Sequence, residues 1–275
     1  MRISMHAFRL YLLEIVMLIL SLIYITPLII MVLTSLKTSG EADAFNLKWP
    51  TKWMFSNYVD IFEKANLVRS LLNSVFITVT TLVIVIVFSS MAAFIIARVS
   101  NKRTKSIYYL FSMGLFVPLF LITTIAVNKF LHINGTYLGI ILVYVSTTLS
   151  WSVFLYTGFI KGIPRELDES AIVEGCGSVK LFFRIIFPLL LPVTATNVIV
   201  LAITIWNDFL LPLFLLNNSK QWTITLSIYG FFGQYSRDWN LVCAVLVVTL
   251  APITILYFSF QKYVIEGMTA GAVKG

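Results

Sequence analysis

The chain of 275 residues is 59% hydrophobic and only 12% charged, and its formal net charge is +8. This composition excludes an ordinary soluble domain. The positive charge does not indicate a nucleic-acid partner, because the basic residues are scattered at the ends of apolar runs and form no stripe with aromatic residues. Since about 20 consecutive apolar residues cross a bilayer as a helix, the sequence predicts an all-α, polytopic membrane protein.

Apolar runs along the chain predict six transmembrane helices. The first run continues to Leu36 and exceeds the roughly 7–15 apolar residues of a signal peptide, so we expect it to be retained. Prolines lie in or beside several runs, and membrane helices tolerate them where neighbours satisfy the freed carbonyl groups. The predicted spans cover residues 11–36, 71–97, 107–127, 138–160, 186–214 and 241–260.

The charges beside these spans predict their orientation. The short loop 98–106 carries Arg98, Lys102, Arg103 and Lys105 without an acidic residue, and such loops favour the cytoplasmic side. We therefore expect a multi-pass protein with both termini in the cytoplasm. The outer segments are then 37–70, 128–137 and 215–240, and the longest cytoplasmic loop is 161–185.

Most of the longest cytoplasmic loop belongs to an acidic segment at residues 164–188, PRELDESAIVEGCGSVKLFFRIIFP. Pro164 suits the first position of a helix, and Glu166, Asp168 and Glu169 complement the positive end of that helix. The small residues beside Glu169 equally suit close contact with another protein, so a structural and a docking role both remain open. Helix stop and restart signals follow at Gly175, Gly177 and Ser178.

This segment resembles the EAA loop of permease subunits in binding-protein-dependent ABC importers. That loop has E-A-A, three residues, G, nine residues and I-x-L-P, and this chain keeps the spacing, with Ser170 for an alanine and Phe187 for the leucine. The stretches WNDFLLPL (206–213) and FQKYVIEGMTAGAVKG (260–275) resemble the carbohydrate branch, specifically the maltose-type second permease. The matching EAA positions are Glu169, Ser170, Ala171, Gly175, Ile185 and Pro188.

The resemblance implies a type I ABC importer permease fold, with six helices and cytoplasmic coupling helices, in a bacterial plasma membrane. Residues 1–70 would form the first helix and an extracellular loop, residues 71–263 the permease core, and residues 264–275 a flexible cytoplasmic tail. The EAA loop, within 164–188, would dock on an ATPase subunit.

The implied function is half of a translocation path for a sugar, most naturally an oligosaccharide. A second permease would form the other half, two ATPase subunits would drive it, and an extracellular solute-binding protein would deliver the sugar. The chain has no G-x-x-x-x-G-K-[ST] motif, so we expect it to be non-catalytic, without cofactor or metal, while the ATPases bind ATP and Mg. The resemblance assigns Gly267, Gly271 and Lys274 to ATPase contact, and Trp222, Tyr229 and Tyr235 to contact with the binding protein.

A polar group in the fifth run is the candidate sugar contact. Trp206, Asn207 and Asp208 lie together there, and an ionisable residue at membrane depth is a functional candidate. Sugars offer hydroxyl groups to polar acceptors and flat C–H faces to aromatic rings. The alternative is a helix break near the outer surface, with Asp208 hydrated.

Other functions have less support in the sequence. An ion-coupled secondary transporter requires broken helices at matching positions in two repeats, and only the fifth run is interrupted. A membrane enzyme requires clustered catalytic groups, whereas His6 and His132 lie alone on opposite sides of the predicted membrane. Within ABC importers the alternative substrate is glycerol 3-phosphate or its diesters, which would favour a basic pocket in the spans.

Overall fold

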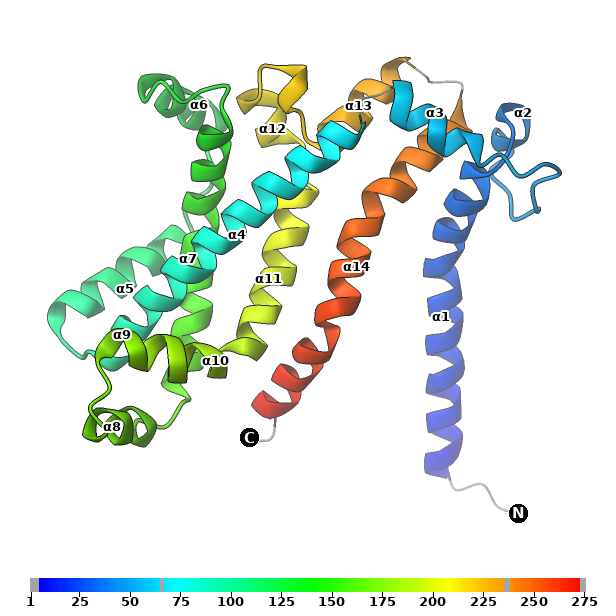
Figure 1. The fold of residues 1–275 in the computed structure, drawn as a ribbon. Coiled ribbons are helices and arrows are strands. Elements are labelled where there is room, and N and C mark those ends of the chain that lie inside the picture. Colours follow the sequence, from blue (N-terminus) through cyan, green and yellow to red (C-terminus); the bar gives the residue numbers. More distant parts are fainter. Residues whose placement is uncertain (1–4, 65–66, 235–237, 273–275) are drawn as a thin grey trace. The chain divides into compact units, whose positions relative to one another are not determined.

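The computed structural model describes residues 5–64, 67–234 and 238–272, and the regular elements in these ranges are helices (Figure 1). Contacts divide the chain into an N-terminal unit (residues 1–68 and 227–251) and a core unit (residues 69–226 and 252–275). The elements are α1 (Met5–Ser35), α2 (Ser39–Ala42), α3 (Ser56–Lys64), α4 (Leu67–Arg98), α5 (Lys102–Gly114), α6 (Leu121–Phe130), α7 (Tyr137–Lys161), α8 (Glu166–Val173), α9 (Ser178–Leu181), the π-helix η1 (Phe182–Ile186), α10 (Phe187–Leu189), α11 (Leu191–Trp206), α12 (Leu210–Leu215), the 3-10 helix η2 (Ser219–Gln221), α13 (Ile224–Gln234) and α14 (Trp239–Ala272).

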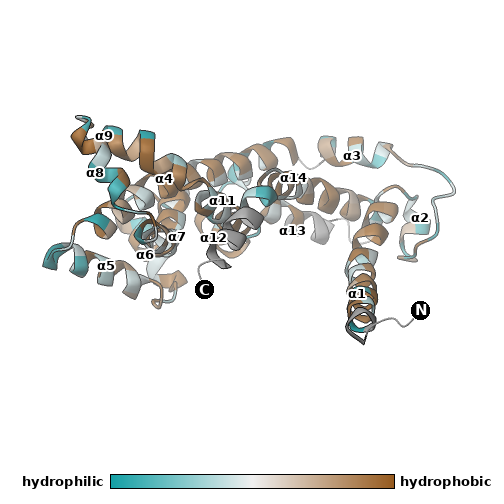
Figure 2. Ribbon diagram, turned by 90° about the horizontal axis from the view of Figure 1, so that it is seen from below, coloured by the Kyte–Doolittle hydropathy of each residue, from teal (hydrophilic) through white to brown (hydrophobic). Residues whose placement is uncertain are grey.

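In the described ranges, 4 helices are long and apolar enough to cross a membrane, or up to 5 if a bent pair forms one span. They are Arg9–Ser35 in α1, α4, α7 and Trp239–Tyr263 in α14. Figure 2 shows hydrophobic residues along α4 and hydrophilic residues gathered at one end of α5 and on α8. The all-helical fold class is confirmed, whereas the predicted number of six spans is not.

The third predicted span, 107–127, is wrong as a continuous helix. The structure has the shorter helices α5 and α6 there, separated by residues 115–120. Pro118 lies in that connection. Proline lacks an N–H donor and disfavours the helical conformation of the residue before it, which explains why the helix does not continue.

The N-terminal unit contains a folded segment after α1, as expected for a small cap. Asn57 on α3 donates from Nδ2 to the carbonyl groups of Ser35 (2.8 Å) and Lys37 (3.0 Å), and its Oδ1 accepts from Asn240 Nδ2 at 3.0 Å. The buried Lys37 ammonium donates to the carbonyl of Asn46 at 2.8 Å. These bonds satisfy buried polar groups and so define the cap. Its apolar cluster is Ile61, Leu67, Ile228, Leu241, Val242, Ala244 and Val245.

Two apolar clusters hold the core unit together. One joins α4, α7, α11 and α12, and the other joins the opposite parts of α4, α7 and α11 to α9 and η1. Side-chain hydrogen bonds also link α7 to α11: Tyr156 to Thr194 at 3.0 Å and Ser152 to Asn197 at 3.0 Å. Small and polar residues at such contacts let membrane helices pack closely.

The last helix is longer than the sequence predicted. Helix α14 continues to Ala272, so Gly267 and Gly271 are helical residues and not part of a flexible tail. Apart from these glycines, residues 264–272 lack strong helix breakers. Lys274 lies outside the described residues.

Candidate functional site

The EAA segment folds as a short helix, a tight turn and a second helical stretch, as predicted. Two details differ: α8 begins at Glu166, after Pro164 and the N-cap Arg165, and the N-cap of α9 is Gly177, with Ser178 as the first helical residue. Helix α8 ends at Val173, after which the N–H of Gly175 donates to the carbonyl of Ile172 and the N–H of Cys176 to that of Ala171, both at 2.9 Å. This pair of bonds is a Schellman motif. Gly175 has φ of 80° there, a value that glycine adopts without the steric cost of a Cβ atom.

A buried ion pair anchors α8 to the end of α4. Arg98 Nε lies 2.5 Å from Asp168 Oδ2, and Arg98 Nη2 lies 3.3 Å from Asp168 Oδ1. Arg98 also donates from Nη1 to the carbonyl of Ile163 at 3.1 Å. The guanidinium therefore binds both the helix and the turn before it, and Asp168 has a structural role.

The opposite face of α8 is exposed. Glu169 and Ser170 are exposed, and Ile172 and Val173 are 60% and 88% exposed despite being apolar. Ala171 instead packs inward within the second apolar cluster, so its small side chain serves the chain's own core. Ile172 and Val173 were not predicted as part of this face, although two β-branched residues in a loop outside the membrane were a usable signal.

After the Gly175 turn, the chain bends sharply before it continues as α11. The stretch Ser178–Leu189 meets Leu191–Trp206 at an angle of 74°. Pro192 cannot donate to the carbonyl of residue 188, so the break coincides with a missing helical hydrogen bond. Of the EAA positions here, Ile185 is half-buried and Pro188 is exposed. The fifth predicted span, 186–214, is therefore divided at Leu190 and again before α12.

Two neighbouring cavities lie between α7, α11 and the α5–α6 connection. Their volumes are about 740 Å³ and 500 Å³, and both are lined by Leu119, Thr147, Thr148 and Thr204. Hydroxyl groups dominate their polar lining, and neither is lined by Lys or Arg. Such hydroxyls donate to carbonyls of their own helix, as Thr204 does to Val200 at 2.8 Å, and keep lone pairs free to accept a hydrogen bond.

The three predicted sugar-contact residues differ in whether they line a cavity. Asn207 and Asp208 line the second cavity, whereas Trp206 is only 4% exposed and does not line it. Asp208 accepts from Tyr144 at 2.9 Å through Oδ2 and from the N–H of Leu210 at 2.9 Å through Oδ1. It thus joins α7 to the start of α12, which supports the helix-break alternative for this residue.

An aromatic residue that the sequence analysis overlooked, Trp151, lines the larger cavity. Tyr144, Thr147, Thr148 and Trp151 share one face of α7, because residues spaced by three, four and seven positions align on a helix. That spacing was readable in the sequence but was hidden among many apolar residues.

The residues predicted to contact a binding protein differ in their exposure. Trp222 is half-buried, and its carbonyl accepts from Asn73 Nδ2 at 3.0 Å. Tyr229 is exposed. Tyr235 lies outside the described residues. Within the described ranges, no group of three or more His, Cys, Asp and Glu side chains could hold a metal ion.

Sequence comparison identifies the class of this membrane protein. Residues 86–270 match the family described as the binding-protein-dependent transport system inner membrane component. The chain is 36% identical to the probable starch degradation products transport permease of Thermoanaerobacterium thermosulfurigenes, over 96% of this chain and 97% of the relative. It is 35% identical to the melibiose/raffinose/stachyose import permease of Bacillus subtilis, over 90% and 91%. The chain therefore belongs to this family of ABC transporter permeases.

A solved structure agrees with this assignment at the level of the fold. A chain of a bacterial ABC transporter that imports the acidic polysaccharide alginate has a TM-score of 0.82 and 19% identity, over 96% of this chain and 99% of that chain. The expected ABC permease fold is thus confirmed.

Proposed function

We propose that this chain is a permease subunit of an ATP-driven, binding-protein-dependent importer of a sugar, most naturally an oligosaccharide. The permeases from T. thermosulfurigenes and B. subtilis are described as transporting starch degradation products and melibiose, raffinose or stachyose. A relative from Streptococcus mutans belongs to a multiple sugar-binding transport system. A second permease and an extracellular solute-binding protein complete the proposed assembly, in a bacterial plasma membrane with both termini of this chain in the cytoplasm.

The exposed face of α8 is the observation that carries the coupling mechanism. Glu169, Ile172 and Val173 project together from a helix whose opposite face is fixed by Asp168 and Ala171. Exposed apolar residues beside a charge suit a protein interface. In the proposal an ATPase subunit, which binds ATP and Mg, holds this face, and its movement passes through the anchored helix to the spans.

The hydroxyl-lined cavities are the proposed part of the sugar path in this chain. Threonine and serine hydroxyls accept from sugar hydroxyl groups, and Trp151 offers an aromatic surface. The absence of Lys and Arg from these linings gives no support to glycerol 3-phosphate or its diesters.

Charge reversal on α8 tests the proposal. In the complete transporter reconstituted in vesicles, Glu169→Lys should reduce ATP-dependent sugar uptake at least about tenfold, because the loss of about 1.4 kcal/mol of docking free energy has that effect. The ATPase subunit should also be released more readily during purification. The control is Glu174→Lys, which places the same charge change at the helix C-terminus, where a cation is favourable. Uptake by Glu169→Lys equal to that of the control would contradict the coupling role.

A further inference from the structure

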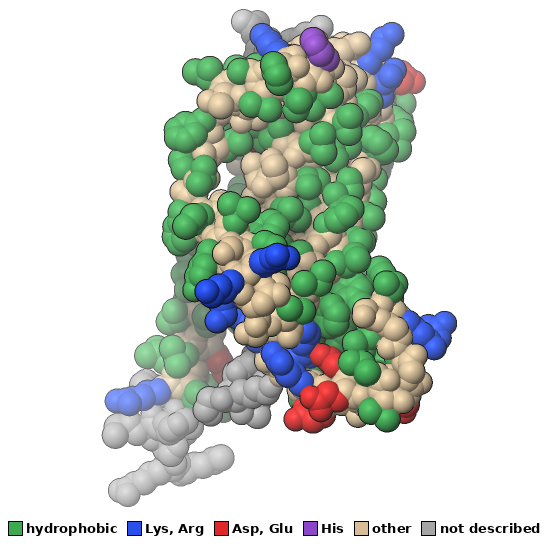
Figure 3. Space-filling model, turned by 90° about the vertical axis from the view of Figure 1, so that its left-hand side faces the viewer, with side chains coloured by type: hydrophobic (Ala, Val, Ile, Leu, Met, Phe, Trp, Pro, Cys, Tyr) green, Lys and Arg blue, Asp and Glu red, His purple; other side chains and the backbone are tan. Residues whose placement is uncertain are grey.

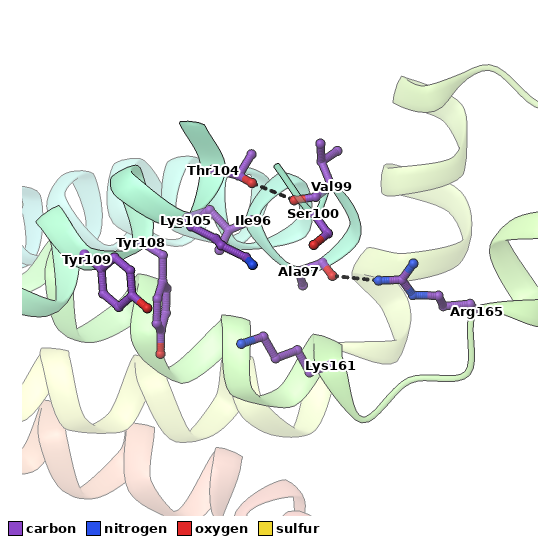
Figure 4. Close-up of a pocket in the computed structure, with 10 residues that line it drawn as sticks. All are labelled: Ile96, Ala97, Val99, Ser100, Thr104, Lys105, Tyr108, Tyr109, Lys161 and Arg165. Carbon is purple, nitrogen blue, oxygen red and sulfur yellow. Dashed lines mark hydrogen bonds between the residues drawn. The ribbon is translucent and has the colours of Figure 1, made fainter. Parts of the chain in front are cut away.

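A third cavity in the core unit has a different chemistry from the two hydroxyl-lined ones. Its volume is about 450 Å³, and it lies between the end of α4, the start of α5 and the end of α7 (Figure 4). Three basic residues line it, Lys105, Lys161 and Arg165, and no acidic residue does. The remaining lining residues are Ile96, Ala97, Val99, Ser100, Thr104, Tyr108 and Tyr109.

The two lysines are available to an anion. Figure 4 shows both amines directed into the space between α5 and α7. Lys161 Nζ lies 5.0 Å from the centre of the Tyr108 ring, a cation–π contact that orients the amine without neutralising it. In the described part of the chain neither lysine forms an ion pair with a carboxylate, and Asp168 is already bound to Arg98.

Arg165 closes the other end of this cavity. Its Nη2 donates to the carbonyl of Ala97 at 3.4 Å, so the guanidinium is held across the gap between the α7–α8 turn and α4 (Figure 4). Three cations around one space repel each other unless an anion lies among them. The arrangement therefore favours a ligand with at least one negative charge and several acceptor oxygens.

The surroundings indicate that this anion belongs to a lipid. Ile107, Leu110 and Met113 are exposed and apolar on the face of α5 opposite the cavity lining, so this helix borders apolar surroundings. Tyr108 and Tyr109 have the amphipathic character typical of the membrane interface. Figure 3 shows Lys and Arg side chains gathered below a band of hydrophobic side chains on this face. Basic pockets between membrane helices recognise anionic headgroups.

We propose that this cavity binds the phosphate headgroup of an anionic phospholipid. The bound phosphate bridges Lys105 on α5 and Lys161 on α7, beside the Arg165 turn that leads into α8. A lipid at this position links the membrane surface to the α8 anchor, and so regulates how firmly the coupling segment is held. The proposed lipid site requires that the protein is inserted in a membrane, but it does not require that the transported substrate is a sugar.

The test compares two double variants of the complete transporter. Lys105→Gln with Lys161→Gln should weaken phosphatidylglycerol binding in phosphatidylcholine nanodiscs about 30-fold, equivalent to about 2 kcal/mol at roughly 1 kcal/mol for each lysine. Lys102→Gln with Arg103→Gln is the matched control, because both residues are exposed at the same end of α5 and outside the cavity lining. Native mass spectrometry counts the retained lipids.

Further measurements separate other ligands from a lipid. If about 10 mM inorganic phosphate displaces the bound lipid while sodium chloride at the same ionic strength, which screens charges equally, does not, the site takes free phosphate and the lipid assignment is wrong. Equal lipid retention by the two double variants would overturn the proposal. It would also be overturned if the Lys105→Gln, Lys161→Gln variant lost the ATPase subunit but kept its lipid, because the lysines would then belong to a protein contact. If the cavity variant does not assemble, photoreactive phosphatidylglycerol on the unmodified transporter replaces it, and crosslinks must map to α5 and α7. Crosslinks elsewhere would exclude the site.

Discussion

At the residue scale, two neighbouring carboxylates of α8 have opposite surroundings. Asp168 is buried against Arg98, whereas Glu169 is exposed. A step of one residue rotates the side chain by about 100° around a helix, so one acid faces the protein and the other faces away. The pairing also explains why α8 can present apolar residues outward: its position does not depend on them.

Removing the buried carboxylate should loosen the segment. Asp168→Ala leaves the Arg98 guanidinium without its counter-charge, and breaking a buried ion pair costs about 3 kcal/mol. We expect faster amide hydrogen exchange in residues 166–177 than in the Glu174→Ala control, whose side chain is exposed. Equal exchange in the two variants would show that the ion pair does not anchor α8.

The two glycines of the turn provide a second test at this scale. Gly175 has φ of 80° and Gly177 has φ of −70°, and a Cβ atom at either would have nothing within 4 Å. Gly175→Ala should therefore lower the free energy of unfolding by about 1 kcal/mol, while Gly177→Ala, whose φ alanine adopts freely, should lower it less, through the weaker N-cap of α9 alone. Thermal unfolding of the purified complex measures the difference, and equal melting temperatures would argue against a positive-φ requirement.

At the element scale, two breaks in helices border a cavity. The α5–α6 connection and the break before α12 both lie in the core unit. Leu119 from the first break and Asp208 from the last line one cavity. Backbone that leaves the helical pattern at membrane depth requires polar surroundings or a water-filled space, and the hydroxyls of α7 and α11 supply them.

The role of those hydroxyls can be measured directly. Thr147→Val with Thr204→Val removes two cavity hydroxyls while preserving side-chain shape. At about 1 kcal/mol for each hydrogen bond, we expect the sugar concentration for half-maximal uptake to rise several-fold or more. Thr196→Val is the control, since it removes a hydroxyl from α11 outside both cavities. A rise no larger than in the control would place the sugar path elsewhere.

At the scale of the whole molecule, the basic and acidic loops define a single expected orientation. Loop 98–106 and α8 are joined by the Arg98–Asp168 pair, so the two elements lie on the same side of any membrane. Positive charge in short loops favours the cytoplasmic side, so we expect that side to face the cytoplasm.

Labelling of single cysteines tests this orientation. In a variant without Cys176 and Cys243, Lys102→Cys should resist an impermeant maleimide in intact cells and react after the membrane is opened. Lys48→Cys, in the segment after α1, should react in both states. Both starting positions are exposed and lie outside the α8 face, so the contrast reports sidedness and not burial. Reaction of Lys102→Cys from outside would reverse the expected topology.

The class of protein, the all-helical fold and the helix–turn–helix form of residues 166–181 were all predictable from the amino-acid sequence. Hydropathy, glycine position and motif spacing depend on residues that are near one another in the sequence, so they can be read without the tertiary structure. Packing between distant segments settles three further outcomes: Asp168 and not Glu169 is paired, Trp206 is buried while Trp151 lines a cavity, and Lys105 and Lys161 line the same cavity. These outcomes depend on contacts between residues far apart in the chain, and a side chain is buried or exposed according to what packs against it.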